Sequence, residues 1–432
     1  MTARPRLPIG ACVFVAVVVL GWREPGPSGD GTSYMWMAQQ FARGEWRDAL
    51  SMVFPPGFPL LLAPLIALGI DPWAAGVFTG ALCLALLTAP LARIAADLVP
   101  GTQAPMAAVL LLLGSPHLLN VAAEVYSEPP FLLAMAWGTI AGLRRRWWWC
   151  GACAAAAYWI RPEGLLLAAS YVLTAPRGAW RTLVGAAGGV LALGLLRAAA
   201  GHSFDPLPML AFHELRDDLP HRGDVLHNLP ELPLCFVESL GLASVLALVG
   251  LRHCRGLAWA LPVQIVLQAG AILTFVVRKR FFLSCAVPVL ALASRELASW
   301  PLRVRRVVLA ISVAAGLVLA WPGSDSNRAA EVEVGRWLAR RLPPDAALVT
   351  DLMRVAWFAG RRPPAPRHFS AEQLLQQAND PAVQCVVLSS RSQQGQFAAV
   401  EDGLAFAFAR AELPASLRGA ADDRGIAVFL RR

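Results

Sequence analysis

The sequence has almost no lysine and few charged residues of any kind. Only Lys279 is a lysine among 38 basic residues, and charged residues make up 16% of the 432 positions. A soluble domain usually carries about 25% charged residues, whereas apolar residues make up 56% here. This shortage of charge excludes a soluble enzyme, a disordered chain and a fibrous protein. The composition is typical of a protein that crosses a membrane many times.

Basic runs with interleaved aromatics are also lacking, so no nucleic-acid partner is expected. The cysteines do not suggest disulfide pairs, because all but Cys385 lie in apolar stretches or in a short basic loop. Cys150 and Cys153 form a single C-x-x-C in an apolar segment, which favours helix packing over metal or redox chemistry. No internal repeat of the kind that builds transporters is visible.

Long apolar stretches recur along residues 1–321. A bilayer core of about 30 Å requires about 20 helical residues, so several stretches are short for a crossing. The first follows Arg4 and Arg6 and has no small-residue cleavage site after it, which predicts an uncleaved anchor. The stretches lie at roughly 8–22, 57–70, 73–95, 103–121, 129–143, 147–160, 163–176, 180–199, 232–251, 256–277, 281–294 and 305–321.

The arginines predict the orientation, because Lys and Arg are retained on the cytoplasmic side. Six basic loops fall on one side if 57–70 does not cross fully and the chain turns at 161–164. Pro55 and Pro56 interrupt any helix entering 57–70, and Pro162 disfavours helix at the residue before it. We therefore predict about eleven crossings plus a surface or re-entrant segment, with a cytoplasmic N-terminus. The loops contain Arg4/Arg6, Arg93, Arg144–Arg146, Arg177/Arg181, Arg252/Arg255 and Arg295/Arg303/Arg305/Arg306.

The tail from 322 to 432 has a mixed helix and strand pattern. Apolar residues at helical spacing predict an amphipathic helix near 331–342. Strand-like runs lie at Ala346–Thr350, Val383–Ser389 and Gly425–Leu430. We predict two domains: an all-α polytopic membrane domain at 1–321, with its first outer loop at 23–72, and a small extracytoplasmic α/β domain at 322–432.

Acidic residues on the predicted outer face could act on a hydroxyl group. A carboxylate at the membrane surface, as at Asp30, can accept a proton from an incoming hydroxyl. Asp30 could instead simply begin a short helix that is capped by Thr32 or Ser33. Glu128 follows Glu124 closely and opens the next apolar stretch, so it could be only a helix-start signal favoured by the helix dipole.

Cations lie on the same predicted face. Arg161 and Glu163 could pair with each other, or Arg161 could face an anionic ligand at the outer end of the helices. Arg278, Lys279 and Arg280 place positive charge on the side that should be poor in it. A bound phosphate would offset this cost, because guanidinium groups hold phosphate through two parallel hydrogen bonds. Alternatively, the cluster extends to lipid headgroups.

Histidines and acids crowd the loop 201–231, but they lack a fixed metal-ligand spacing. We expect a solvated loop that orders when substrate binds. No cofactor is assigned, and no residue pattern indicates a divalent metal, although a metal requirement is left open. The histidines are His202, His213, His221 and His227.

In their order, these features resemble the GT-C glycosyltransferases, in particular bacterial relatives of protein O-mannosyltransferases and of the lipid A aminoarabinose transferase. The resemblance covers about residues 1–300. Its motifs are Gly29-Asp30-Gly31-x-x-Tyr34 with Ala38 and Gly44, Pro55-Pro56-Gly57-Phe58-Pro59, Ser127-Glu128-Pro129, Arg161-Pro162-Glu163-Gly164 and Arg278-Lys279-Arg280-Phe281. Many relatives have two adjacent acids where this chain has Asp30-Gly31, so the resemblance does not support a role that needs both, such as metal binding.

The resemblance implies an inverting glycosyltransferase that moves a sugar from a polyprenyl-phosphate carrier to a hydroxyl acceptor. The reaction would occur at the outer face of the bacterial cytoplasmic membrane, among membrane lipids. Asp30 matches the usual base candidate, and Glu128 matches a second acid of the same cavity. Arg161 matches a cation that faces the lipid phosphate, and Lys279 or Arg280 matches a late basic pair. The expected substrate-cavity residues are Tyr34, Glu124, Glu163 and Arg278.

Two other interpretations of the sequence compete with transfer. A transporter or flippase for a lipid-linked saccharide predicts ionisable residues near mid-membrane and two related halves, whereas here such residues gather at one surface. A catalytically silent relative whose soluble tail binds a partner is the other interpretation, and Asp30 argues against it only weakly.

Overall fold

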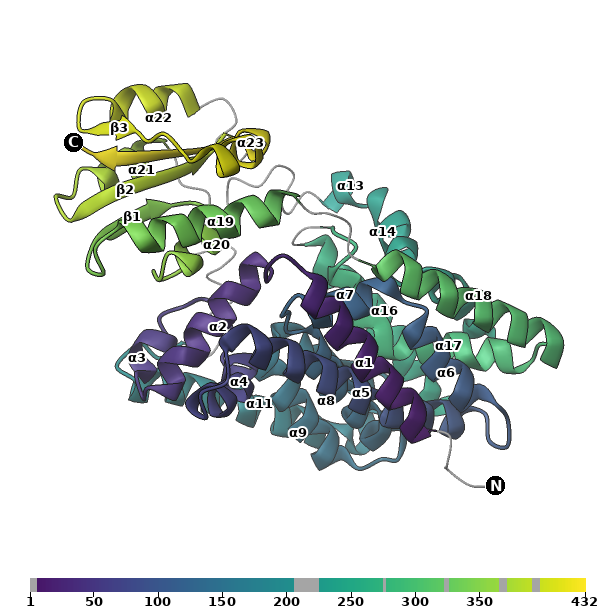
Figure 1. Cartoon of the computed structure of the whole chain (residues 1–432). Coiled ribbons are helices and arrows are strands. Elements are labelled where there is room, and N and C mark those ends of the chain that lie inside the picture. The colour runs from purple at the N-terminus through teal and green to yellow at the C-terminus, as the bar shows by residue number, and fades with distance from the viewer. Residues whose placement is uncertain (1–5, 206–224, 275–276, 322–325, 365–370, 391–396) are drawn as a thin grey trace.

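The computed structural model describes the chain except residues 1–5, 206–224, 275–276, 322–325, 365–370 and 391–396. Helices from the first three quarters of the chain pack side by side, and a small sheet with its own helices lies over α2 and one end of α1 (Figure 1). We call the described residues from Ser326 to Arg432 the C-terminal unit. The multi-pass helical architecture and the small C-terminal sheet agree with the sequence-based prediction.

The helical part is built from many short helices. Its α-helices are α1 (Arg6–Arg23), α2 (Gly29–Ala42), α3 (Trp46–Ala49), α4 (Gly57–Ala67), α5 (Pro72–Leu98), α6 (Ala104–Leu113), α7 (Pro116–Ala123), α8 (Glu128–Leu143), α9 (Trp147–Ile160), α10 (Leu165–Thr174), α11 (Pro176–Ala199), α13 (Val225–Asn228), α14 (Glu231–Leu240), α15 (Leu242–Gly250), α16 (Ala260–Leu273), α17 (Ala286–Ala298) and α18 (Leu302–Ala320). Its 3-10 helices are η1 (Pro162–Gly164), η2 (Leu251–His253), η3 (Gly256–Trp259) and η4 (Phe281–Cys285).

Four helices among the described residues are long and apolar enough to cross a membrane, or up to six if each of two bent pairs is one span. The four are Pro72–Leu98, Pro176–Ala199, Gly256–Leu273 and Phe281–Ala298. The predicted total of about eleven crossings is therefore not confirmed by helix length and composition. Helix α4 has 11 residues, which span only about 16 Å at 1.5 Å per residue, too short to cross a bilayer core.

Two apolar stretches that we predicted as continuous are broken in the structure. The α6 and α7 helices bend by 58° at Gly114–Ser115, and the helices on either side of Gly241 bend by 108°. Pro116, the first residue of α7, has no N–H to continue the preceding helix. Gly241 has φ +58° and ψ −132°, a backbone conformation that only glycine adopts without strain.

The helices share one apolar core formed by buried residues between Val13 and Ala320. Glycine allows a close approach of two backbones at Gly57, where an added Cβ would lie 2.6 Å from the carbonyl oxygen of Trp159. Large apolar side chains such as Leu86, Leu191 and Val318 are exposed on the outside. An apolar exterior over an apolar core is the arrangement of helices surrounded by lipid.

The C-terminal unit is a four-stranded sheet in the order β1-β2-β4-β3, covered by helices on both faces. Its β1 and β2 strands are parallel, and β4 is antiparallel to β2 and β3. Three strands and the first helix were predicted; β3 was missed because three residues carry no alternation. The elements are α19 (Ser326–Arg341), β1 (Ala347–Thr350), α20 (Met353–Phe358), α21 (Ala371–Ala378), β2 (Val383–Ser389), α22 (Phe397–Leu404), β3 (Phe408–Arg410), α23 (Ala415–Arg424) and β4 (Ile426–Arg431).

Candidate active site

Helix α2 holds Asp30 in its first turn. The helix begins at Gly29 with Ser28 as its N-cap, and the Ser28 Oγ accepts a 2.9 Å hydrogen bond from the Gly31 N–H. The expected cap at Thr32 or Ser33 was therefore wrong, because the serine just before the helix already satisfies the free N–H group. The acid also lies at the positive end of the helix dipole, which favours its ionised form.

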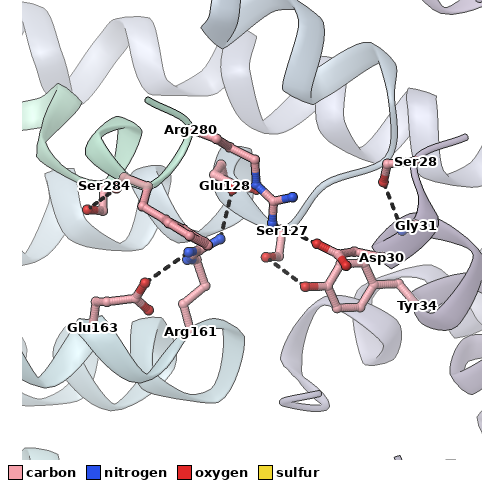
Figure 2. Close-up of polar contacts among 11 residues, drawn as sticks. Ser28, Asp30, Gly31, Tyr34, Ser127, Glu128, Arg161, Glu163, Arg280 and Ser284 are labelled. Atoms are coloured by element: carbon pink, nitrogen blue, oxygen red, sulfur yellow. Dashed lines mark hydrogen bonds and ion pairs between the residues drawn. The ribbon is translucent and has the colours of Figure 1, made fainter. Parts of the chain in front are cut away.

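Arg280 joins the two predicted acids (Figure 2). Its Nη2 donates a 2.8 Å hydrogen bond to Oδ2 of Asp30, and its Nε donates a 2.9 Å hydrogen bond to Oε1 of Glu128. The guanidinium carbon lies 4.0 Å from the ring centroid of Tyr126, so the cation also stacks on an aromatic face. Arg280 therefore connects the start of α2 with the start of α8.

Arg161 extends the same network. Its Nη1 donates a 2.8 Å hydrogen bond to Oε1 of Glu128, and its Nη2 donates a 2.9 Å hydrogen bond to Oε1 of Glu163. Both Arg161 and Glu128 are buried. Pro162 holds the preceding Arg161 in extended geometry, with φ −152° and ψ 137°, which ends α9 at this position. Arg161 does pair with Glu163, as one interpretation of the sequence predicted, but this ion pair is only one part of a larger cluster.

This acid–arginine cluster, defined as Asp30, Glu128, Arg161, Glu163 and Arg280, has three carboxylates and two guanidinium groups. Burial lowers the pKa of Arg280, but the carboxylates of Glu128 and Asp30 outweigh burial and raise it well above its usual value. Burial likewise lowers the pKa of Arg161, and the carboxylates of Glu163 and Glu128 outweigh it and raise the pKa. Both cations therefore stay charged, and the cluster keeps an acidic excess of one charge when its carboxylates are ionised.

Three buried atoms of the cluster lack a hydrogen-bond partner among the described residues. They are Oε2 of Glu128, Nε of Arg161 and Oε2 of Glu163. Most buried polar atoms in proteins are hydrogen-bonded to protein or water. Such atoms, two acceptors and one donor, can hold water or the polar groups of a ligand.

Tyr34 forms one wall beside the cluster. Its hydroxyl lies 3.2 Å from Oγ of Ser127, and its ring packs edge-on against Phe54 and Phe58. Burial, and then the charge of Asp30, raise the pKa of Tyr34. The phenol is therefore neutral at physiological pH and can donate a hydrogen bond.

The remaining predicted residues do not join the cluster directly. Arg278 and Lys279 are exposed, and neither forms an ion pair within the described part of the chain. Oε2 of Glu124 lies 2.7 Å from Nη2 of Arg328, a residue of the C-terminal unit that no sequence pattern singled out. Arg280 is thus the member of the basic triplet that turns inward.

Only the two ends of the histidine-rich loop 201–231 lie within the described residues. Nε2 of His202 lies 2.8 Å from the carbonyl oxygen of Arg47, whereas His213 and His221 lie outside the described residues. Within the described residues, no group of three or more His, Cys, Asp or Glu side chains is arranged to hold a metal ion.

The arrangement of helices and C-terminal sheet is the GT-C fold that the sequence resemblance predicted. Over 99% of its length the chain is similar to a crystal structure of ArnT from Cupriavidus metallidurans bound to undecaprenyl phosphate, with a TM-score of 0.69 and 15% identity over 98% of that chain. The apo state of the same protein gives a TM-score of 0.64 and 15% identity over 97% of both chains. Comparison of the sequence with protein-family models and with curated proteins gives no match.

Proposed function

We propose that the protein is an inverting glycosyltransferase that moves a sugar from a polyprenyl-phosphate carrier to a hydroxyl acceptor. The observation that carries the proposal is the buried network in which Arg280 and Arg161 meet Asp30 and Glu128. The network supports chemistry that needs both a base and cations for a phosphate. The similar ArnT structure with bound undecaprenyl phosphate supports a polyprenyl carrier.

We propose that this network faces the outside of the bacterial cytoplasmic membrane. If the bent pairs and the shorter helices cross and α4 does not, the chain makes eleven crossings from a cytoplasmic N-terminus. The membrane domain would then be residues 1–321, and the periplasmic or extracellular domain would be residues 322–432. At the opposite helix ends, Arg144 pairs with Asp97 and Arg252 with Glu296, in keeping with an arginine-rich cytoplasmic face.

The proposed reaction needs one proton transfer and one displacement. Asp30 takes the proton from the acceptor hydroxyl while its oxygen forms a bond to the anomeric carbon. The bond between that carbon and the phosphate oxygen breaks on the opposite side, so the configuration inverts. Polyprenyl phosphate leaves as an anion that cations stabilise, because its charge increases as the bond breaks.

Donor binding requires the cations to change partners. In the present structure Arg280 and Arg161 already bind carboxylates. A phosphate that takes hydrogen bonds from Arg280 would release Asp30 and leave its carboxylate available to the acceptor hydroxyl. Charge interactions of this kind are stronger in a partly water-excluded site than in bulk water. Lys279 remains a candidate second cation for the phosphate.

A transporter or flippase for the same carrier is the alternative that we consider second. It does not need a carboxylate held at one end of the helices, and it would use paired, interrupted helices at mid-membrane. Mass spectrometry of envelope lipids and glycans tests the proposal by comparing a deletion strain with the same strain after the gene is restored. We expect the deletion to remove one sugar from an acceptor and to increase the sugar-bearing carrier; identical spectra would count against transfer.

A further inference from the structure

The C-terminal unit contacts the segment that leads into α2. An added Cβ at Gly26 would lie 2.7 Å from Cγ2 of Val332, and one at Gly29 would lie 3.4 Å from Sδ of Met353. Residues 26–29 therefore lie directly against α19 and α20, and Figure 1 shows these two helices between the sheet and α2. The unit is in contact with the backbone that positions Asp30.

Two arginines of the unit bind this region through buried or half-buried hydrogen bonds. Nη2 of Arg328 lies 2.7 Å from Oε2 of Glu124, and its Nη1 lies 3.2 Å from Oε2 of Glu24. Nε of Arg354 donates a 2.7 Å hydrogen bond to the carbonyl oxygen of Pro27. Glu331 of α19 in turn pairs with Arg354, which fixes the direction of that guanidinium.

Three consecutive hydrogen bonds connect Arg328 to the turn that carries Asp30. The side chain of Glu124 accepts a hydrogen bond from Arg328. The backbone carbonyl oxygen of Glu124 accepts a 2.9 Å hydrogen bond from the N–H of Ser28. Ser28 then caps α2 through the Gly31 N–H. Asp30 lies between these two residues, so a shift of Glu124 would shift the turn that carries the carboxylate.

The segment after Glu124 needs external support. Val125 has φ +63°, a left-handed conformation that is strained for a β-branched residue. Such strain persists only where surrounding contacts hold the backbone in place. The next residue, Tyr126, is the ring on which Arg280 stacks. The Glu124–Tyr126 segment therefore links the C-terminal unit to both Asp30 and Arg280.

We infer that Arg328 and Arg354 are positioning residues, and that the C-terminal unit acts as a clamp that sets the place of Asp30 relative to Arg280. The clamp acts on Asp30 through the Ser28 cap and the Pro27 carbonyl. The inference rests on the proposed function for what Asp30 does, but the placement of Asp30 can be tested without any substrate.

Hydrogen–deuterium exchange of the full-length protein in nanodiscs tests this clamp. In Arg328→Gln and Arg354→Gln, amides within residues 26–34 should exchange about 10-fold faster or more than in the wild type, because charge-assisted hydrogen bonds are lost. Arg328→Lys should restore most of the protection. Arg410→Gln is the matched control, since Arg410 lies in the same unit in an exposed pair with Glu401, and it should leave residues 26–34 unchanged.

Each outcome of this experiment decides the inference. Unchanged exchange at residues 26–34 in both glutamine variants would overturn it. So would faster exchange that extends equally through α5, because the arginines would then support the whole fold rather than one turn. Once the transfer product is identified, kcat should fall about 10- to 100-fold while the KM for the donor stays constant. A failure of the proposed function would remove this second readout only.

Discussion

Nη2 of Arg280 lies 2.8 Å from Oδ2 of Asp30, although 250 positions separate the two residues in the sequence. The same guanidinium reaches Glu128, so one side chain holds both proposed acids of the site. Asp30 is thereby stabilised as a carboxylate, the form that a general base requires. The ion pair also gives Arg280, alone of the three consecutive cations after α16, carboxylate partners among the described residues.

Removal of Arg280 should destabilise the protein. Arg280→Ala leaves two carboxylates without their shared cation, and loss of one partner from a buried pair costs about 3–5 kcal/mol. Because the Arg280 side chain is 28% exposed, we expect the lower end of this range. Thermal unfolding in detergent should show a clear fall in Tm for Arg280→Ala and a partial recovery for Arg280→Lys. Arg278→Ala, at the exposed neighbouring position, should unfold like the wild type; equal Tm values for all variants would contradict the role of Arg280.

Arg161 should contribute to binding of the donor phosphate. Undecaprenyl phosphate should raise the Tm of the wild type, because a ligand that binds only the folded state stabilises it. The increase should be lost or strongly reduced in Arg161→Gln. Arg144→Gln is the control, since Arg144 pairs with Asp97 at the opposite helix ends. An undiminished ligand-induced shift in Arg161→Gln would remove Arg161 from the phosphate site.

Tyr34 should make the fold sensitive to alkaline pH. Its pKa is raised by burial and then by Asp30, so the folded protein favours the neutral phenol. The stabilisation is complete below the ordinary tyrosine pKa of about 10 and is lost as the pH rises toward the folded value. The Tm of the wild type should therefore fall more steeply above pH 10 than that of Tyr34→Phe. Parallel curves for the two proteins would show that Tyr34 does not contribute.

Cysteine labelling in intact cells should establish the orientation. Glu45 and Gln384 are exposed on the predicted outer side, and Arg146 is exposed on the predicted cytoplasmic side. In a background without the native cysteines, an impermeant maleimide should label Glu45→Cys and Gln384→Cys directly. Arg146→Cys should react only after the membrane is permeabilised. Protection of Glu45→Cys and Gln384→Cys from the maleimide would reverse the proposed topology, and the cluster would then face the cytoplasm.

Local patterns predicted much of the fold. The strands β1, β2 and β4 follow apolar runs between polar residues, and the amphipathic α19 follows helical spacing. The breaks at Gly114 and Gly241 were missed, because glycine also occurs inside continuous packed helices of this chain, as at Gly76 of α5 and Gly138 of α8. Hydropathy averages over such residues, whereas the direction of a helix depends on the backbone angles of one or two of them.

The site was harder to predict than the fold. The types of residue were evident, because charge is expensive near a membrane and Asp30, Glu128 and Arg161 stand out there. Arg280 turns inward to acids that are distant in the sequence, Asp30 and Glu128, and no spacing rule distinguishes it from its two basic neighbours. The pairing of Glu124 with Arg328 joins positions 204 residues apart, and a contact of that range leaves no local pattern.

The most direct test of the central claim compares cell envelopes from strains that produce the wild type, Asp30→Asn or Asp71→Asn. Asp71 is the control because it is an exposed cap at the start of α5, where asparagine serves equally well. Mass spectrometry should show the sugar-modified acceptor with the wild type and with Asp71→Asn. With Asp30→Asn, that product should fall by about 100-fold or more, and the sugar-bearing polyprenyl phosphate should accumulate. Normal amounts of product from Asp30→Asn would contradict the proposal that Asp30 is the base for sugar transfer.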